Sequence, residues 1–231
     1  MKAIVEEAHK FGKHTGAHCM TAQGMLNCLD AGVDTIIHAR HHDENGNNVY
    51  RPDVTERILK QGAMVNMTIY GTSIIINATE EKKAKFGLTP EEQAVQDHRM
   101  KMRDFILESF FRMHKAGVKM AAGSDAAWGK HTLGQFHNEV VYHVKGGMTA
   151  MQALTAATLN AAKSCWIDDK VGSLEPGKEV DILVVNGDPS RDVADLKNVV
   201  DVFQAGRKVD RGSAATAGTG HPLERLWPAN N

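Results

Sequence analysis

Two histidines and an aspartate each close a short apolar segment that begins after a glycine. His18 and His38 lie six residues after their glycines, and Asp125 lies eight residues after its own. Side chains alternate between the two faces of a strand, so these even offsets place all three on one face if the glycines mark equivalent strand starts. Two imidazoles and a carboxylate gathered in this way suit a divalent metal. The sequence therefore predicts a metal site made of His18, His38 and Asp125.

Composition narrows the class of protein. The chain has 231 residues, of which 42% are hydrophobic and 24% are charged, and its formal net charge is -1. These values are ordinary for a soluble globular protein with a sizeable core, and they predict no nucleic-acid partner. No apolar run approaches the roughly 20 residues that a membrane span needs. The three scattered cysteines, with no visible signal peptide, favour a cytoplasmic location.

Helical and strand patterns alternate along the first part of the chain. Capping boxes are predicted at Asp53 with Glu56 and at Thr89 with Glu92, where two of the helices begin. This alternation predicts an α/β protein with a parallel sheet and right-handed crossovers. The expected strands are 13–18, 33–39, 63–69 and 118–122; the expected helices are an opening helix that ends at Gly12, 21–31, 53–61 and 89–116; and the insertion 70–88 is expected to be a loop with some helix.

The chain changes character towards its end. Two helices are expected at 133–145 and 149–165, the second beginning with a capping box of Thr149 and Gln152. A strand is expected at 181–186 and a hairpin made of 199–204 and 208–209. The predicted organisation has three parts: an alternating part over 1–166, a small β element over 167–212 and a loosely structured tail over 213–231.

Functional side chains at the C-terminal ends of parallel strands are typical of the active face of a (β/α)₈ TIM barrel. Four strand–helix units are half of that fold. The fold class predicted from the sequence is therefore a partial TIM barrel followed by a small β element. An open half barrel leaves two edge strands unpaired. A homo-oligomer in which two copies cover each other's edges would resolve this.

Five motifs carry a resemblance to a known family. They are Gly-Ala-His18-Cys, Ala-Gly-Val-Asp-Thr-Ile-Ile-His38, Ala-Gly-Ser-Asp125-Ala, Gly-Met-Thr-Ala-Met-Gln-Ala-Leu-Thr-Ala-Ala-Thr-Leu-Asn160-Ala-Ala and Gly-Ser-Leu-Glu-Pro-Gly-Lys-Glu-Val-Asp181-Ile-Leu-Val-Val. In this order and spacing the chain resembles the metal-dependent amidohydrolase superfamily, in its imidazolonepropionase and Xaa-Pro dipeptidase (prolidase)-like branch. The resemblance covers nearly the whole chain up to Gly212.

The resemblance implies a fold and a set of ligands. The fold is a barrel that carries a small β-sandwich. His18, His38 and Asp125 would be ligands from strands five, six and eight of a divalent metal site, with zinc the first expectation and one or two ions in a complete enzyme. The family's His-x-His pair of strand one and carboxylated lysine of strand four have no counterpart here. The chain is therefore expected to be the C-terminal half of such an enzyme.

The resemblance also implies a reaction. The substrate would be a small amide, a cyclic amide or a dipeptide-like molecule, cleaved at a C–N bond by a metal-activated water. Asp125 would take the proton of that water and pass it to the leaving amine. His38 would hold the metal or steady the oxyanion. Tyr70 and His41 are the candidates for substrate contact.

Several alternatives stay open. The chain could be a truncated or degenerate half barrel that acts as a binding or assembly module without catalysis, or the product of an incomplete reading frame. Tyr70 could serve packing instead of substrate contact. Cys19 is interpreted as a packing residue in preference to a nucleophile. Four further histidines are interpreted as surface residues: His41 and His42 on a solvated loop, and His137 and His143 on a helix.

Overall fold

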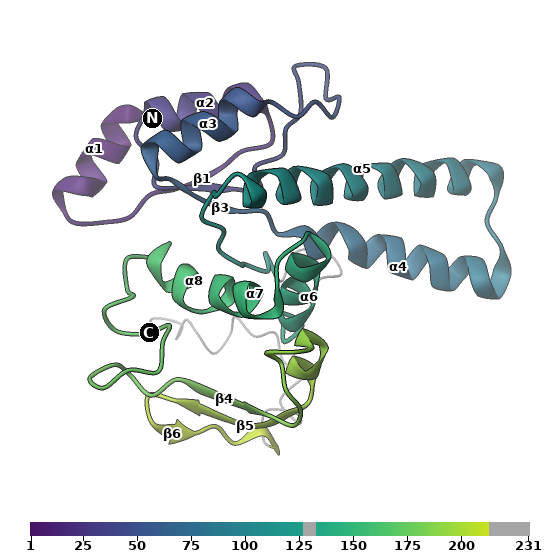
Figure 1. Ribbon diagram of the computed structural model, residues 1–231. Helices are drawn as coiled ribbons and strands as arrows, with labels where there is room; N and C mark the ends of the chain where they lie inside the picture. The colour runs from purple at the N-terminus through teal and green to yellow at the C-terminus, as the bar shows by residue number, and fades with distance from the viewer. Residues whose placement is uncertain (127–132, 213–231) are drawn as a thin grey trace, which may run out of the picture.

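A computed structural model of the protein describes residues 1–126 and 133–212 (Figure 1). Its first half alternates between helices and strands, as predicted. Strands β1, β2 and β3 form a parallel sheet in that order. Thr35 of β2 pairs with Gly16 of β1 and Met64 of β3, so the three strands run level with one another. The elements are α1 (Lys2–Lys10), β1 (Gly16–His18), α2 (Ala22–Asp30), β2 (Thr35–Ile37), α3 (Pro52–Gln61) and β3 (Met64–Asn66).

The predicted fourth strand lies beside β3 but pairs over a very short length. The backbone N–H of Val65 donates to Lys119 O at 3.0 Å, and the N–H of Ala121 donates to Val65 O at 2.9 Å. These bonds form a single parallel bridge between Val65 and Met120. The structure therefore shows an α/β chain with a parallel sheet, in which residues 118–122 occupy the fourth position.

Helices α2 and α3 lie together on one side of this sheet (Figure 1). Pro52 occupies the first turn of α3, and Arg51 is the N-cap residue without a side-chain cap. The predicted capping box at Asp53 is therefore wrong, because Pro52 starts the helix earlier and Asp53 pairs with Arg51 instead. One hydrophobic cluster joins the sheet to these helices; its buried members include Met25, Cys28, Leu29, Ile36, Val54, Ile58 and Val65.

Two long helices, α4 (Ile69–Phe86) and α5 (Pro90–Lys115), form a hairpin that extends away from the sheet (Figure 1). The insertion over 70–88, expected to be a loop with some helix, is far more helical than expected, because α4 continues to Phe86 and packs along α5. The capping box of Thr89 and Glu92 is confirmed. The C-terminal end of α5 is buried at Ile106, Phe110 and Met113, whereas Val95, near its start, is exposed.

The second half of the chain contains α6 (His137–Lys145), α7 (Ala150–Ala157), α8 (Leu159–Lys163) and a small antiparallel sheet. The capping box at Thr149 is confirmed, but the single helix expected over 149–165 is broken at Thr158, whose φ and ψ of -123° and -89° are not helical. Asn160 then donates from Nδ2 to Met120 O at 3.0 Å, which ties α8 to the fourth sheet position.

The predicted β element is confirmed as a three-stranded sheet in the order β4–β5–β6. Its elements are β4 (Ile182–Val185), the 3-10 helix η1 (Val193–Lys197), β5 (Val199–Gln204) and β6 (Arg207–Lys208). The tail predicted over 213–231 lies outside the described residues. Within the described ranges, no helix combines the length and apolarity that crossing a membrane would require.

Candidate metal centre

The structure brings His18 and His38 together at the C-terminal end of the parallel sheet. The centroids of their rings are 4.4 Å apart, and the ring planes cross at 73°. His18 ends β1 beside Ile37 of β2, and His38 follows directly. His18 is exposed, whereas the side chain of His38 is buried. Two imidazoles at this separation fit as a pair of nitrogen ligands to one ion.

The backbone around these residues adopts conformations that L-residues rarely use. His38, Ala39, Thr68 and Asp125 have φ values of 68°, 46°, 48° and 53°, all in the left-handed region. Each such residue costs about 1–3 kcal/mol, so the surrounding structure must hold it. The hydrogen bond from His38 N to Asn66 O, at 2.6 Å, is one such restraint. Strain gathered at three successive strand ends is typical of a functional site.

The ring of His38 has a defined hydrogen bond. Its Nδ1 atom lies 2.7 Å from Oγ1 of Thr68, and the Thr68 hydroxyl lies 2.8 Å from Met67 O, to which it donates. A hydroxyl has a single hydrogen, so the Thr68 oxygen can only accept from His38. The proton of the neutral imidazole is therefore on Nδ1, and Nε2 keeps its lone pair for a metal.

The charge state of His38 also fits a metal ligand. Burial lowers its pKa most, the positive charges of Arg40 and His18 lower it further, and Asp125 acts in the opposite direction. A neutral imidazole is the form that binds a metal. Asp125 is exposed and close enough for its charge to act on both His38 and Arg40.

The predicted site is incomplete in the part of the chain that the structure describes. No group of three or more His, Cys, Asp or Glu side chains there is arranged to hold a metal ion. His18 and His38 supply a fitting pair, but Asp125 does not complete a three-ligand site with them. The roles of the three residues as ligands stay predictions.

Arg40 is a charged residue of this site that the sequence patterns did not reveal. Its side chain is only 7% exposed, and its Nη2 donates to Thr68 O at 3.4 Å, whereas Nη1 has no hydrogen-bond partner within the protein. Burial lowers the pKa of Arg40 to about 10, against the opposing effects of Glu139 and Asp125. The guanidinium thus stays charged at neutral pH, and two carboxylates favour its charge.

Glu139 of α6 is a second such residue. It is completely buried, and its carboxylate accepts from the backbone N–H groups of Ile69 at 2.8 Å and Tyr70 at 2.7 Å. Its Oε1 also lies 3.4 Å from Nε2 of His143, which is completely buried against Phe110. The interpretation of His143 as a surface residue is therefore wrong. No sequence pattern indicated that Arg40 and Glu139 are buried, because the burial of each depends on segments that are far apart in the chain.

The two candidates for substrate contact lie in different surroundings. Tyr70 is half-buried in the first turn of α4, next to Thr68, and its hydroxyl donates to Oε1 of Gln135 at 3.2 Å. Burial and then Tyr142 raise the pKa of Tyr70. Contact between Tyr70 and a substrate stays a prediction.

His41 is not the solvated loop residue of the interpretation above. Its side chain is completely buried, its ring lies 4.5 Å from that of Tyr50, and its Nδ1 accepts from the backbone N–H of Arg51 at 3.2 Å. Burial, as the largest cause, lowers the pKa of His41 to about 4. The buried, neutral ring stabilises the conformation of its own loop. Contact between His41 and a substrate stays a prediction.

The chain is similar in sequence and in fold to proteins of one family. The sequence profile of the amidohydrolase family matches residues 1–209. The chain belongs to the amidohydrolase family. Ochratoxinase from Aspergillus niger is 28% identical to this amidohydrolase over 211 residues, which are 90% of this chain and 40% of the relative. Imidazolonepropionase from Desulfotalea psychrophila is 38% identical over 65 residues, 27% of this chain and 16% of the relative.

The fold of this amidohydrolase is shared with a solved Xaa-Pro dipeptidase that has methionine bound in its active site. The TM-score is 0.71 and the sequence identity 32%, over 90% of this chain and 48% of that one. The resemblance to the imidazolonepropionase and prolidase branch is thereby confirmed. The amidohydrolase chain spans less than half the length of these relatives.

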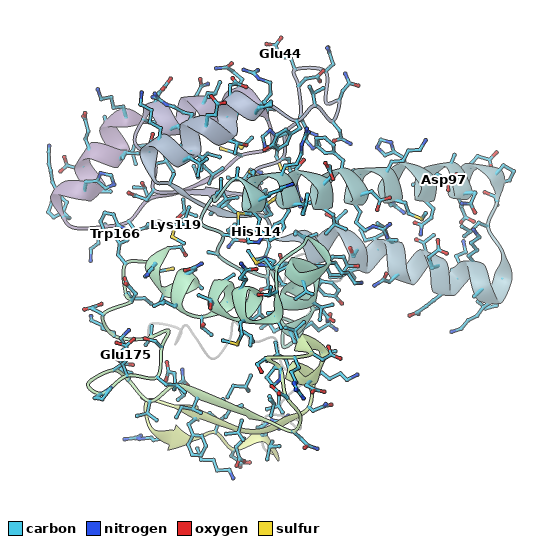
Figure 2. The ribbon with its side chains drawn as sticks, viewed as in Figure 1. Glu44, Asp97, His114, Lys119, Trp166 and Glu175 are labelled. Atoms are coloured by element: carbon cyan, nitrogen blue, oxygen red, sulfur yellow. The ribbon has the colours of Figure 1, made fainter. Side chains whose placement is uncertain are left out.

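Two cavities of this amidohydrolase lie away from the histidine pair. One, of about 400 Å³, is at the opposite end of the sheet, where Lys119 and Trp166 are close together (Figure 2). The other, of about 350 Å³, lies between the start of α2 and the loop that carries Glu44. Neither cavity includes His18, His38 or Asp125.

Proposed function

We propose that this chain is part of a metal-dependent amidohydrolase that cleaves a C–N bond in a small amide, a cyclic amide or a dipeptide-like substrate. The observation that carries the proposal is the His18–His38 pair, with His38 neutral and its Nε2 lone pair unused. Family membership supports the reaction class. The likeness to a Xaa-Pro dipeptidase supports a dipeptide-like substrate.

The residues have distinct parts in the proposed reaction. When bound, a divalent metal, with Zn²⁺ the first expectation, supplies acidification of water and polarisation of the carbonyl. His18 and His38 hold the metal through ring nitrogens, and the carboxylate of Asp125 takes the proton of the attacking water and passes it to the leaving amine. Tyr70, two residues after Thr68, contacts the substrate.

The proposed fold of the complete enzyme is a TIM barrel. In this proposal β1, β2, β3 and the segment 118–122 are four of its eight strands, and the sheet β4–β5–β6 belongs to the accompanying sandwich. The parallel order of the strands supports it, because all eight strands of such a barrel are parallel. The remaining ligands would then come from barrel strands outside this chain.

A hydrolysis screen tests this function. The chain, loaded with Zn²⁺ or Mn²⁺, is offered a library of N-acyl amino acids, cyclic amides and dipeptides, and amine release is measured. Asp125→Asn is expected to lower kcat at least about 100-fold, because a general base contributes factors of this size. Asp97→Asn, at the far end of the α4–α5 hairpin (Figure 2), is the matched control and is expected to keep full activity. Hydrolysis that survives Asp125→Asn unchanged would contradict the assigned role.

A non-catalytic assembly module is the second candidate. Among the described residues, β1 has a strand partner on one side only. An unpaired edge strand is a ready site for pairing with another chain. If two copies pair in this way, light scattering will give a dimer. Proline in place of Gly16, whose N–H group is directed away from β2 because Thr15 and Cys19 make the bonds to that strand, is expected to yield monomers. A stable monomer at all concentrations would remove this candidate.

A further inference from the structure

The N-cap position of α4 is unusual. Thr68 occupies it, and a threonine there normally accepts from the backbone N–H of the second or third helical residue. Thr68 makes no such bond, because its φ and ψ are 48° and 57° and its hydroxyl bonds Met67 O and His38 Nδ1 instead. The first N–H groups of α4 therefore need another acceptor.

Glu139 supplies that acceptor from a helix that follows about 70 residues later. Its two carboxylate oxygens each accept one N–H group, from Ile69 and Tyr70. A carboxylate at a helix N-terminus is further stabilised by the helix dipole. Because Glu139 caps α4, the Thr68 hydroxyl is left available for His38. Arg40 reinforces the same residue by donating to Thr68 O.

We propose that Glu139 is a positioning residue for His38. It acts through Thr68: the capped start of α4 holds Thr68 in its left-handed conformation, in which the hydroxyl fixes the Nδ1–H tautomer of His38. The ring of His143 packs on Phe110, and its Nε2 lies 3.4 Å from Oε1 of the Glu139 carboxylate. The inference rests on the proposed function only in giving His38 the role of a ligand.

Side-chain ¹⁵N NMR of the metal-free chain tests this, because it reports which ring nitrogen carries the proton. At about pH 8, above the ordinary histidine pKa, the wild-type His38 is expected to be in the Nδ1–H form. One hydrogen bond favours that form about tenfold. Glu139→Gln loses one of the two acceptor oxygens and is expected to return His38 to a mixture of tautomers. Glu108→Gln, at an exposed glutamate of α5, is the control and is expected to change nothing.

A double-variant comparison separates positioning from general destabilisation. Thr68→Val alone is expected to remove the tautomer preference of His38, and Glu139→Gln added to it is expected to have no further effect. Zn²⁺ affinity is expected to fall about 10- to 100-fold in each single variant. If Glu139→Gln does not fold, Glu139→Asp, whose shorter side chain does not reach both N–H groups, is measured in its place.

Three results would overturn the inference. They are an Nε2–H tautomer of His38 in the wild type, a wild-type tautomer in the Glu139 variant, and an equal effect of that variant with and without the Thr68 hydroxyl. The readout needs no catalysis. A chain that hydrolyses nothing would count against the proposed function and leave this inference standing.

Discussion

The Nδ1 atom of His38 donates to the Thr68 hydroxyl over 2.7 Å, and this single contact joins the loop after β2 to the start of α4. Thr68→Val keeps the β-branched shape, so the backbone strain at this position is unchanged. The buried Nδ1–H group is left without an acceptor. We expect the free energy of unfolding to fall by about 1–3 kcal/mol, measured by urea denaturation. Thr68→Ser restores the hydroxyl and is expected to recover most of the loss; equal losses in both variants would contradict the assigned bond.

Arg40 is buried, and the charges of Glu139 and Asp125 act on it. Arg40→Met removes this positive charge and its hydrogen bond to Thr68 O. The free energy of unfolding is expected to fall by about 1.5–3 kcal/mol, the usual contribution of a hydrogen bond that involves a charged group. Arg57→Met removes a surface pair with Asp30 and is the matched control, with little change expected. Similar losses of stability in the two variants would contradict the stabilising role assigned to the buried charge of Arg40.

Stability is expected to fall in mild acid because of His41. Its pKa in the folded chain is about 4, against 6.5 when unfolded. Between these values the unfolded state binds the proton and the folded state does not, so stability is present above the higher pKa and is lost as the pH falls towards the lower one. The full loss is about 3 kcal/mol. His41→Gln, compared with wild type in urea at neutral pH and at about pH 5, is expected to flatten this dependence. An unchanged slope would argue against a buried neutral His41.

The cysteines are expected to differ sharply in reactivity. Burial, and then the neighbouring thiol of Cys28 at 3.1 Å, raises the pKa of the Cys19 thiol to about 12. Cys165 is exposed. Because the thiolate is the reactive form, iodoacetamide should alkylate Cys165 alone in the folded chain and all three cysteines after unfolding. Mass spectrometry counts the labels, and rapid native labelling of Cys19 would contradict its burial.

Much of the fold followed from local patterns in the sequence. The glycine offsets of His18 and His38 predicted a shared face, and their rings lie 4.4 Å apart. The capping boxes at Thr89 and Thr149 marked helix starts correctly, because they depend on residues within one turn. The length of helix α4 was missed because its apolar pattern is weak and its stability depends on packing against α5.

The supporting residues of the site could not be predicted. Arg40, Glu139 and His143 carry charge or titrate, and such residues are usually exposed. Their burial results from the meeting of the loop after β2, the start of α4 and helix α6, which are separated by up to about 100 residues. The burial of His41 was missed for the same reason: a polar loop sequence gave no sign that this ring packs against Tyr50 and accepts from the backbone of Arg51.

The central claim is that His18 and His38 bind one metal ion. Zn²⁺ titration followed by the ring ¹⁵N and ¹H NMR signals of all histidines tests it most directly. The signals of His18 and His38 are expected to shift together and to saturate at a single equivalent, with the His38 shift located at Nε2, and His38→Asn is expected to abolish the response of both. If neither ring responds, or if zinc first perturbs exposed histidines elsewhere, the account is contradicted.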